Sequence, residues 1–438
     1  MRSVKVASAV LLACALTACS SGSGEEAKNS KHGTGDDQPG KKVVRINVPS
    51  AYDNARGWQE PVAAGGLDGA VPLASAPRSG LVTYLDSTGT GYVLKAREAE
   101  TGKLRWRSRP WKPPVPEEGD TETGEAEPPK LAVITSEGAE YVVAYAYGEK
   151  QKDELSPKRE VVEVVSYRAN ASGQNVAPLK TADVPVVGEP EHINADGSGV
   201  VIDETTSVET VNIVTGRIRT YESCDLCEDE GDAFATVDQG IVTSSPATGY
   251  QVLGAWKGAD TVPAEYRDWN ANAIAVTENY VIGTWRNLND DDDSRWVLHD
   301  ARSGKVLVTM QCYPPEGTGN ANPKLYTPSV SASGRYLVAG TGAFDLKRKK
   351  GYCFEGTDER NPIELTTVDD NGIAYGASVP ADPSDPSPQV QVPLSTGTPK
   401  TVASGAIIPA ADAAGYGFFT APTGSGKLAL GLIAYPHR

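Results

Sequence analysis

The sequence predicts an all-β fold, and three features of the 438-residue chain support that expectation. First, short runs of β-branched and aromatic residues recur from residue 43 onward, and Gly, Pro, Asn and Asp separate them, as is typical of sheet strands. Second, helical periodicity is nearly absent, and only residues 263–273 ("PAEYRDWNANA") suggest one short helix. Third, a short turn motif repeats along the chain. These features disfavour most α/β enzymes and two-lobed solute-binding proteins.

Eight stretches give the clearest strands, and they are spread over the whole domain. Each is rich in β-branched or aromatic residues and is bounded by turn-forming residues. In chain order they are "GLVTYLDS" (80–87), "AEYVVAYAY" (139–147), "EVVEVVSYR" (160–168), "SGVVIDET" (198–205), "QGIVTSS" (239–245), "NYVIGTW" (279–285), "GRYLVAGT" (334–341) and "GYGFFTAP" (415–422).

A turn motif between pairs of strands defines a repeating unit. Each copy has an apolar strand, an acidic or amide residue, a Thr-Gly or Ser-Gly turn and a second strand. The glycine supplies the positive φ of a tight hairpin. The clear copies are "AREAETGKLRW" (96–106), "TVNIVTGRIRTY" (210–221) and "VLHDARSGKVLV" (297–308), and weaker copies lie at Ser172-Gly173, Thr248-Gly249 and Thr396-Gly397.

The spacing of the copies indicates a β-propeller. Thr215, Ser303 and Thr396 are each about 90 residues apart, roughly twice the 40–45-residue period of a four-stranded blade. The first copy resembles the repeat of PQQ-like (quinoprotein-type) β-propellers, Ala-x-Asp-x-x-Thr-Gly-Lys-x-x-Trp. The matching residues are Ala96, Thr101, Gly102, Lys103 and Trp106, while Glu98 stands where Asp is usual. The resemblance implies a propeller fold, and in degraded form it covers nearly the whole domain.

We therefore expect residues 43–438 to form a single all-β propeller of eight four-stranded blades, with seven blades as the alternative. The expected blade centres lie near residues 88, 155, 206, 246, 293, 343, 385 and 420. The last unit, 405–438, supplies only about three strands, and "KVVRINVP" (42–49) is a lone strand at the other end. Pairing the two would close the ring with an N-terminal strand and remove the open sheet edges.

The N-terminus has the features of a lipoprotein signal peptide over residues 1–18. A basic start precedes an apolar run over 6–18, which is too short to cross a ~30 Å hydrocarbon core. Leu16-Thr17-Ala18-Cys19 resembles the lipobox of bacterial lipoproteins, in which the cysteine receives a diacylglyceryl group and the signal is cut before it. The resemblance implies a lipidated Cys19 in the bilayer and an extracytoplasmic, membrane-anchored domain. The alternative is a plain secretory cleavage site with an incidental cysteine.

The segment over 19–42 is expected to be a flexible tether between the anchor and the propeller. After Cys19 it contains no aromatic and no branched apolar residue, so it cannot bury surface. The whole chain has a formal net charge of -16, which argues against a nucleic-acid partner.

Four of the six cysteines lie in the propeller domain, and an even number in an oxidising compartment favours disulfides. Cys224 and Cys227 form a CxxC surrounded by carboxylates, which favours a short-loop disulfide over a redox dithiol. Cys312 and Cys353 end matching strands of consecutive units, so we expect a bridge between adjacent blades. The alternative is a zinc site that combines both pairs.

Evidence for catalysis is thin. Quinoprotein dehydrogenases hold their cofactor with adjacent cysteines, a Trp floor and calcium, and this chain has no Cys-Cys pair, so we expect no cofactor. His192 and His299 are the two histidines away from the tether and the C-terminus, and no G-x-S-x-G nucleophile motif occurs. "NDDDD" (289–293) offers weak calcium candidates at Asp290, Asp291, Asp292 and Asp293, but a solvated acidic turn is the better interpretation.

We expect a non-catalytic binding or scaffold module of the cell envelope, with its binding surface on one face. The alternative is an enzyme, either an oxidoreductase or a hydrolase or lyase, with its site in the central channel. If the Thr-Gly turns join third to fourth strands, the long insertions at 110–130, 148–160, 223–231, 287–294, 313–328 and 380–388 all project from the opposite face. Its acidic residues are candidates for binding a basic protein, a cation or a wall polymer: Glu117, Glu118, Asp120, Asp229, Glu230, Asp291 and Asp292. We expect a monomer.

Overall fold

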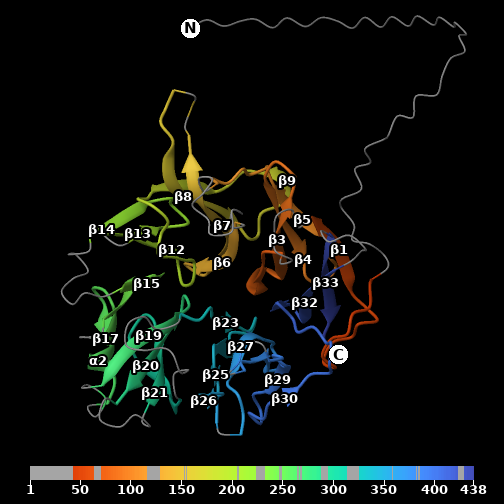
Figure 1. Cartoon of the computed structure of the whole chain (residues 1–438), viewed down its shortest axis with the longest axis vertical. Helices are drawn as coiled ribbons and strands as arrows, with labels where there is room; N and C mark the ends of the chain where they lie inside the picture. Colours follow the sequence, from red (N-terminus) through yellow and green to blue (C-terminus); the bar gives the residue numbers. More distant parts are fainter. Residues whose placement is uncertain are drawn as a thin grey trace, which may run out of the picture. The chain divides into compact units, whose positions relative to one another are not determined.

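The computed structural model describes residues 43–63, 71–115, 129–151, 153, 155–204, 207–222, 232–245, 249–263, 266, 269–287, 294–312, 325–357, 359–380, 382, 385–422 and 429–438. The chain divides into a unit over Met1–Gly35, which lies outside these ranges, and a unit over Asp36–Arg438. The described residues form eight antiparallel sheets that follow one another around a ring (Figure 1). No helix among them is long and apolar enough to cross a membrane.

Each sheet is one blade, and its strands are counted here from the centre of the ring outward. Blade 1 contains β2 (Leu73–Ala76), β3 (Leu81–Ser87), β4 (Tyr92–Glu98) and β5 (Leu104–Ser108); blade 2 contains β6 (Lys130–Ser136), β7 (Ala139–Lys150), β8 (Arg159–Arg168) and β10 (Lys180–Pro185); blade 3 contains β11 (His192–Asn194), β12 (Val200–Asp203), β13 (Ser207–Val211) and β14 (Ile218–Glu222); blade 4 contains β15 (Asp232–Val237), β16 (Gly240–Ser245), β17 (Gly249–Val252) and β18 (Trp256–Lys257).

The second half of the ring follows the same plan. Blade 5 contains β19 (Asn270–Val276), β20 (Tyr280–Arg286), β21 (Ser294–Asp300) and β22 (Val306–Gln311); blade 6 contains β23 (Ser329–Val330), β24 (Tyr336–Ala339), β25 (Gly342–Asp345) and β26 (Lys350–Cys353); blade 7 contains β27 (Ile363–Val368), β28 (Ile373–Ser378), β29 (Gln389–Pro393) and β30 (Lys400–Thr401); blade 8 contains β31 (Ala411–Ala413), β32 (Tyr416–Pro422), β33 (Ala429–Pro436) and β1 (Trp58–Ala63). The predicted eight-bladed propeller is confirmed, and each expected centre falls in a different sheet.

An N-terminal strand closes the ring, but it is not the strand that the sequence suggested. β1 supplies the outer strand of blade 8 and pairs with β33 from Trp58↔Ala434 to Ala63↔Ala429. Residues 43–49 have no strand structure; they lie against blade 8, where Val44 N donates to Gln59 Oε1 at 2.6 Å. The expectation that 42–49 closes the ring is therefore wrong.

Both faces of the inner strands are buried, because each blade packs between two neighbours. β24 shows this directly, since all four of its residues are buried. Eight hydrophobic clusters fill the eight interfaces between neighbouring blades, including the interface of blade 8 with blade 1. This sharing of apolar surface explains why the strands are almost continuously β-branched or aromatic rather than alternating.

The Thr-Gly and Ser-Gly motif forms turns between third and fourth strands, as predicted, in blades 1, 3, 5 and 7. The residue three positions before the Thr or Ser accepts hydrogen bonds that close the turn. In blade 5, Asp300 Oδ1 accepts from Ser303 N at 2.8 Å and from Ser303 Oγ at 2.6 Å. Gly304 has φ +70°, and an added Cβ would lie 2.7 Å from the Trp256 ring. The glycine is thus needed both for the backbone conformation and for the close approach of an aromatic ring.

That aromatic contact recurs between neighbouring blades. A tryptophan on the fourth strand of one blade donates its indole N–H to a main-chain carbonyl in the next blade's turn. The pairs are Trp58 with Ala99 at 2.8 Å, Trp106 with Ala169 at 2.9 Å and Trp256 with Ala301 at 2.8 Å. Burial leaves an indole N–H in need of a partner, so each pair fixes the angle between two blades as well as burying a large ring.

Three smaller expectations differ from the structure. The Thr248-Gly249 copy joins the second and third strands of blade 4, so it is not a turn of the repeating type. The third-to-fourth connection of blade 2 is not short, because it carries β9 (Gly173–Val176), which adds to β5 in parallel. Of the helix expected over 263–273, the last four residues belong instead to β19 (Asn270–Val276), and the short α2 lies earlier, at Gly258–Thr261.

Candidate functional site

The two faces of the ring differ in their connections. Second and fourth strands end at one face, here called the long-loop face, and first and third strands end at the other, the turn face. All six long insertions named from the sequence follow a second or a fourth strand, so the strand order assigns them all to the long-loop face. Lys347, Arg348, Lys349 and Lys350 connect β25 to β26 at the turn face, where Arg348 pairs with Asp345.

Most of the predicted site residues fall outside the described residues. They are Cys19, Glu117, Glu118, Asp120, Cys224, Cys227, Asp229, Glu230, Asp290, Asp291, Asp292 and Asp293. Lipidation at Cys19, the bridge between Cys224 and Cys227, the weak calcium candidates and the acidic binding residues therefore stay predictions.

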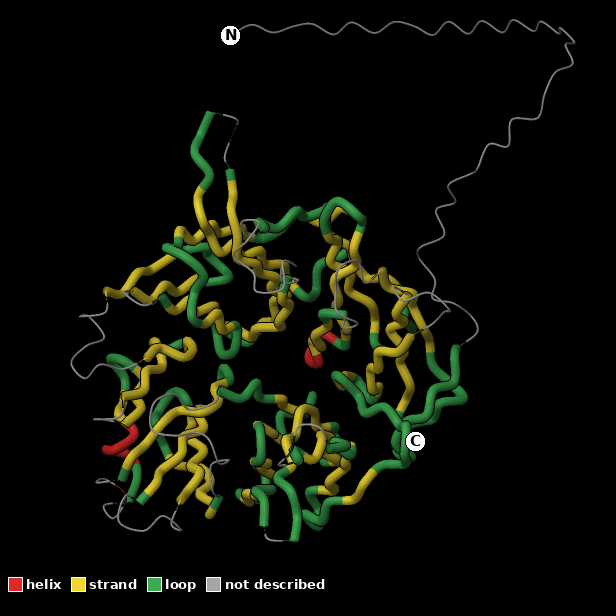
Figure 2. The backbone as a smooth tube through the Cα atoms, viewed as in Figure 1, coloured by secondary structure: helices red, strands yellow, loops and turns green. Residues whose placement is uncertain are grey.

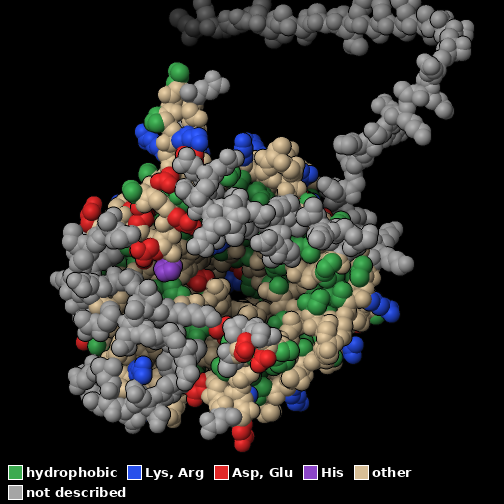
Figure 3. Space-filling model, in the orientation of Figure 1, with side chains coloured by type: hydrophobic (Ala, Val, Ile, Leu, Met, Phe, Trp, Pro, Cys, Tyr) green, Lys and Arg blue, Asp and Glu red, His purple; other side chains and the backbone are tan. Residues whose placement is uncertain are grey.

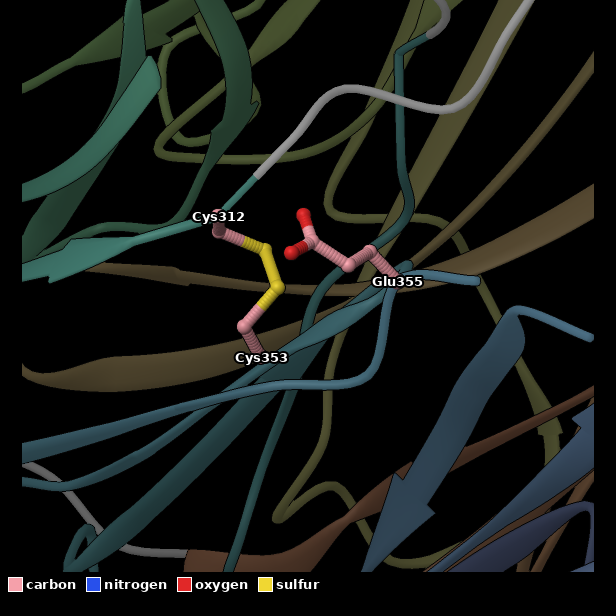
Figure 4. Close-up of side chains that lie close together, drawn as sticks. All are labelled: Cys312, Cys353 and Glu355. Carbon is pink, nitrogen blue, oxygen red and sulfur yellow. A yellow bond between two sulfur atoms is a disulfide. The ribbon is translucent and has the colours of Figure 1, made fainter. Parts of the chain in front are cut away.

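The predicted bridge between adjacent blades is present. Cys312 follows β22, the outer strand of blade 5, and Cys353 ends β26, the outer strand of blade 6; the two sulfurs form a disulfide. The Glu355 carboxylate lies beside this bond (Figure 4). Because both sulfurs are bonded to each other, these three side chains do not form a zinc site in this state.

A cavity of about 480 Å³ lies where the first strands of the blades meet. Space-filling atoms leave the centre of the ring hollow (Figure 3). Among the described residues that line the cavity, Tyr280 is the one aromatic residue. Most of the others are small or apolar, such as Ala74, Ala132, Val276, Ser329, Thr366 and Ala411. The described lining therefore offers no aromatic floor for a planar cofactor.

Charged side chains gather at the turn-face end of this channel. The short helix η1 (Pro77–Ser79) lies near the centre of the ring (red in Figure 2). Both carboxylate oxygens of Glu140 accept from its backbone, from Arg78 N at 2.9 Å and from Ser79 N at 2.7 Å. Arg78 also reaches from blade 1 to blade 5, where its guanidinium lies 3.2 Å from Glu278 Oε2. These contacts hold η1 at the turn-face end of the channel.

Asp196 is the least compensated carboxylate of the channel lining. It lies between β11 and β12 and lines the cavity, and its backbone N–H donates to Asn194 Oδ1 at 2.7 Å. Among the described residues, none donates a hydrogen bond to its carboxylate or pairs with it. Burial raises the pKa of Asp196 to about 7, because a desolvated carboxylate favours the protonated form.

A second carboxylate of the lining, Asp412 on β31, belongs to a cluster that joins the two ends of the domain. Asp412 Oδ2 lies 2.7 Å from His437 Nε2 and accepts from the Tyr52 hydroxyl at 3.4 Å. The other imidazole nitrogen of His437 lies 3.8 Å from Asp369 Oδ2. Burial raises the pKa of Asp412 to about 6. Burial alone would lower the pKa of His437, but the hydrogen bond to Asp412 and the charges of Asp412 and Asp369 raise it above its usual value.

The two histidines singled out from the sequence lie elsewhere. His299 is buried in blade 5, where Nε2 lies 2.5 Å from the Tyr250 hydroxyl and Nδ1 lies 2.8 Å from Gly304 O. Burial lowers the pKa of His299 to about 4, so it is a neutral core residue that braces the Ser-Gly turn. His192 is exposed on β11. The sequence missed Asp196, Asp369 and Asp412, because no motif surrounds them.

No family model matches this sequence, and no curated protein matches it. Among solved structures, the chain is similar to the WD40 domain of SCAP from fission yeast, with a TM-score of 0.39 and 8% identity over 86% of this chain and 98% of that chain. It is also similar to a eukaryotic initiation factor, with a TM-score of 0.36 and 11% identity over 82% of this chain and 95% of that one. These likenesses concern the fold alone.

Proposed function

We propose that this chain is a lipid-anchored extracytoplasmic protein of the cell membrane whose propeller binds an envelope partner without catalysis. The observation that supports the binding role is topological: all six long insertions belong to the long-loop face. In the described chain, no connection from a first to a second strand exceeds five residues. At the turn face of the described chain, the long connection is the third-to-fourth one of blade 2 over 169–179, and its β9 pairs with β5 as part of the sheet. The six insertions of the long-loop face are loops held on one side of a rigid scaffold, where binding usually resides.

The chemistry of the partner follows from the charge of that face. Its loops contain Glu117, Glu118, Asp120, Asp229, Glu230, Asp291 and Asp292 in a chain of net charge -16. A surface of this sign attracts a basic protein, a cation or a cationic wall polymer, and it repels nucleic acid.

Neutralising those seven carboxylates to their amides tests the binding face. We expect cross-linking in intact envelopes to recover less of the partner, while far-UV circular dichroism stays that of a folded β protein. A matched control carries Glu100→Gln, Glu137→Gln and Asp238→Asn, which are exposed at the turn face. Equal partner recovery from both variants would contradict the acidic face as the binding surface.

Cys19→Ala tests the anchor separately. We expect this variant to lose lipid labelling and to be released from membranes, because acyl chains rather than protein contacts hold the chain there. The released domain should keep its unfolding midpoint. A variant that remains membrane-bound after a salt wash would show that the lipobox interpretation is wrong.

A second candidate, a hydrolase or lyase, is favoured by one observation in the channel. Asp196 and Asp412 both line the cavity, and their pKa values are raised to about 7 and about 6, in the range of general acids. Hydrolysis of nitrophenyl glycosides or esters by the purified chain, lost in Asp196→Asn, would support this candidate. The lack of any such activity would leave the binding role in place.

A further inference from the structure

One hairpin of blade 2 projects beyond the rest of the ring. β7 and β8 have 12 and 10 residues and pair as far as Lys150↔Arg159. Their neighbours stop earlier, since β6 pairs with β7 only to Tyr145 and β10 pairs with β8 only to Val161. Figure 1 shows the hairpin rising above the ring at the end of these strands. We call its described residues 148–151, 153 and 155–160 the finger; it lies on the long-loop face.

The finger is braced at its base, and its two described lysines are paired with carboxylates. Glu149 N donates to Val115 O at 2.9 Å on one side, and Gly188 N donates to Glu160 Oε2 at 3.0 Å on the other. Lys158 pairs with Glu149 across the two strands. Lys150 lies 2.6 Å from Asp183 and 3.1 Å from Glu163. Among the finger's described residues, the exposed Arg159 is the cation outside these ion pairs, so the finger carries little free charge to attract a ligand.

The tip is preorganised around an exposed apolar side chain. Asp153 Oδ1 accepts from Leu155 N at 3.1 Å and from Ser156 N and Ser156 Oγ, both at 2.8 Å, and Gln151 Nε2 donates to Ser156 O at 2.8 Å. This turn leaves Leu155 97% exposed. Val187, which is 90% exposed, and Val115, which is 51% exposed, lie beside the finger's base. Three of the five exposed large hydrophobic residues in the described chain thus lie at the tip or the base of the finger, and hydrophobic side chains are visible on the projection in Figure 3.

We propose that the finger is a docking element whose Leu155 inserts into an apolar pocket of a partner protein, with Val115 and Val187 contacting the rim of that pocket. An ordered turn loses little conformational entropy on binding, so the buried leucine contributes most of its transfer free energy to affinity. The inference rests on the proposed binding role of the long-loop face, and it adds an apolar anchor to acidic loops that alone would give steering rather than affinity.

A protein is favoured over a membrane as the occupant. The chain carries a net charge of -16, and Lys150 and Lys158 are already paired. The exposed Arg159 is then the one described cation of the finger outside an ion pair, which is too little to hold an anionic bilayer against that net charge. One leucine also buries less apolar surface than a single acyl chain, which itself binds membranes only marginally. A protein pocket with a neutral or basic rim is not repelled by the acidic face, and it can bury a single leucine completely.

Site-specific cross-linking in intact envelopes tests the placement of the partner. We would replace Leu155 or Val187 in the full chain with p-benzoylphenylalanine, and use Lys305, exposed at the turn face, as the control position. We expect residues 155 and 187 to give an adduct with the same protein, identified by mass spectrometry, and residue 305 to give none. No adduct at 155, or the same adduct at 305, would overturn the proposal.

Affinity of the purified partner for the full chain supplies the second measurement. Leu155→Ser should weaken the Kd by about tenfold or more, whereas Val379→Ser, a matched exposed residue at 38% in another long loop, should leave it unchanged. If Leu155→Ser leaves the Kd unchanged while the seven-carboxylate variant weakens binding, the docking role of Leu155 is refuted, but the long-loop face remains the binding surface. If neither variant weakens binding, both proposals fail. Leu155-dependent flotation of the Cys19→Ala chain with phosphatidylglycerol vesicles would identify a membrane as the occupant and overturn the protein pocket.

Discussion

Closure of the ring depends on a buried ionic contact between β1 and blade 1, and Glu60→Gln is the sharpest test of it. Glu60 is 7% exposed, and its Oε1 lies 2.7 Å from the Arg97 guanidinium and 3.6 Å from Lys95 Nζ. Arg97 is fully buried and also donates to the Tyr84 hydroxyl at 3.1 Å. Removing the carboxylate charge leaves a buried guanidinium without its anion, which costs about 3–5 kcal/mol of unfolding free energy.

Urea titration followed by tryptophan fluorescence measures this loss, and hydrogen exchange locates it. We expect Glu60→Gln to lower the unfolding midpoint and to speed exchange in β1 and β33, because β1 is the strand that closes blade 8. The control is Glu98→Gln, whose contact with Arg105 at 3.9 Å is partly exposed and worth at most about 1 kcal/mol. A double variant that combines Glu60→Leu with Arg97→Met removes both charges and should recover much of the loss. A Glu60→Gln protein within about 1 kcal/mol of the parent would refute the reasoning.

Three further predictions concern other parts of the ring. Cys312→Ser should cost a few kcal/mol, since its bridge closes a 41-residue span; urea midpoints with and without reductant check this. Burial raises the pKa of Asp196 and Glu209 to about 7. Between about pH 4 and pH 7 the folded state therefore binds more protons than the unfolded state, and the unfolding free energy falls as the pH rises through this range. Each carboxylate contributes about 1 kcal/mol, so the unfolding free energy should be higher at pH 6 than at pH 8 by about 2 kcal/mol, and Asp196→Asn should remove about half of that difference. Gly304→Ala should lower stability by about 1–3 kcal/mol, because its Cβ would meet the Trp256 ring; an unchanged thermal midpoint would contradict this.

Much of the fold could be predicted because its determinants are local. The Thr-Gly and Ser-Gly turns need a positive φ at the glycine, and in blades 1, 3 and 5 a side chain three residues before the Thr or Ser caps the turn, as Asp300 does for Ser303. Both determinants lie within a few residues. Strands buried on both faces appear as unbroken β-branched runs. Cysteines at matching positions of consecutive units, such as Cys312 and Cys353, come together because the repeat itself superposes them.

The channel site could not be predicted, because its residues share no local pattern. Asp196 comes from blade 3, whereas Asp412 on β31 and His437 after β33 both come from blade 8, and folding of that sheet brings the last two within 2.7 Å of each other. Their pKa values depend on burial, which no residue's sequence neighbours specify. His437 in particular looks like an ordinary terminal residue until Asp369 and Asp412 are placed on either side of it.

The sequence by itself determined the all-β repeating unit and the matching positions of Cys312 and Cys353, since both depend on turn geometry and strand patterning over a few residues. It favoured eight blades over seven and a disulfide over a zinc site, and the structure decided both in that sense. Only the tertiary structure decided which N-terminal segment closes the ring. β propensity favours the wrong segment, because 42–49 (KVVRINVP) has four β-branched residues, whereas Trp58–Ala63 (WQEPVA) has one and contains Glu and Pro. What selects Trp58–Ala63 is long-range: Trp58 donates to Ala99 O at 2.8 Å and Glu60 meets the buried Arg97, contacts that exist only when blade 8 lies against blade 1.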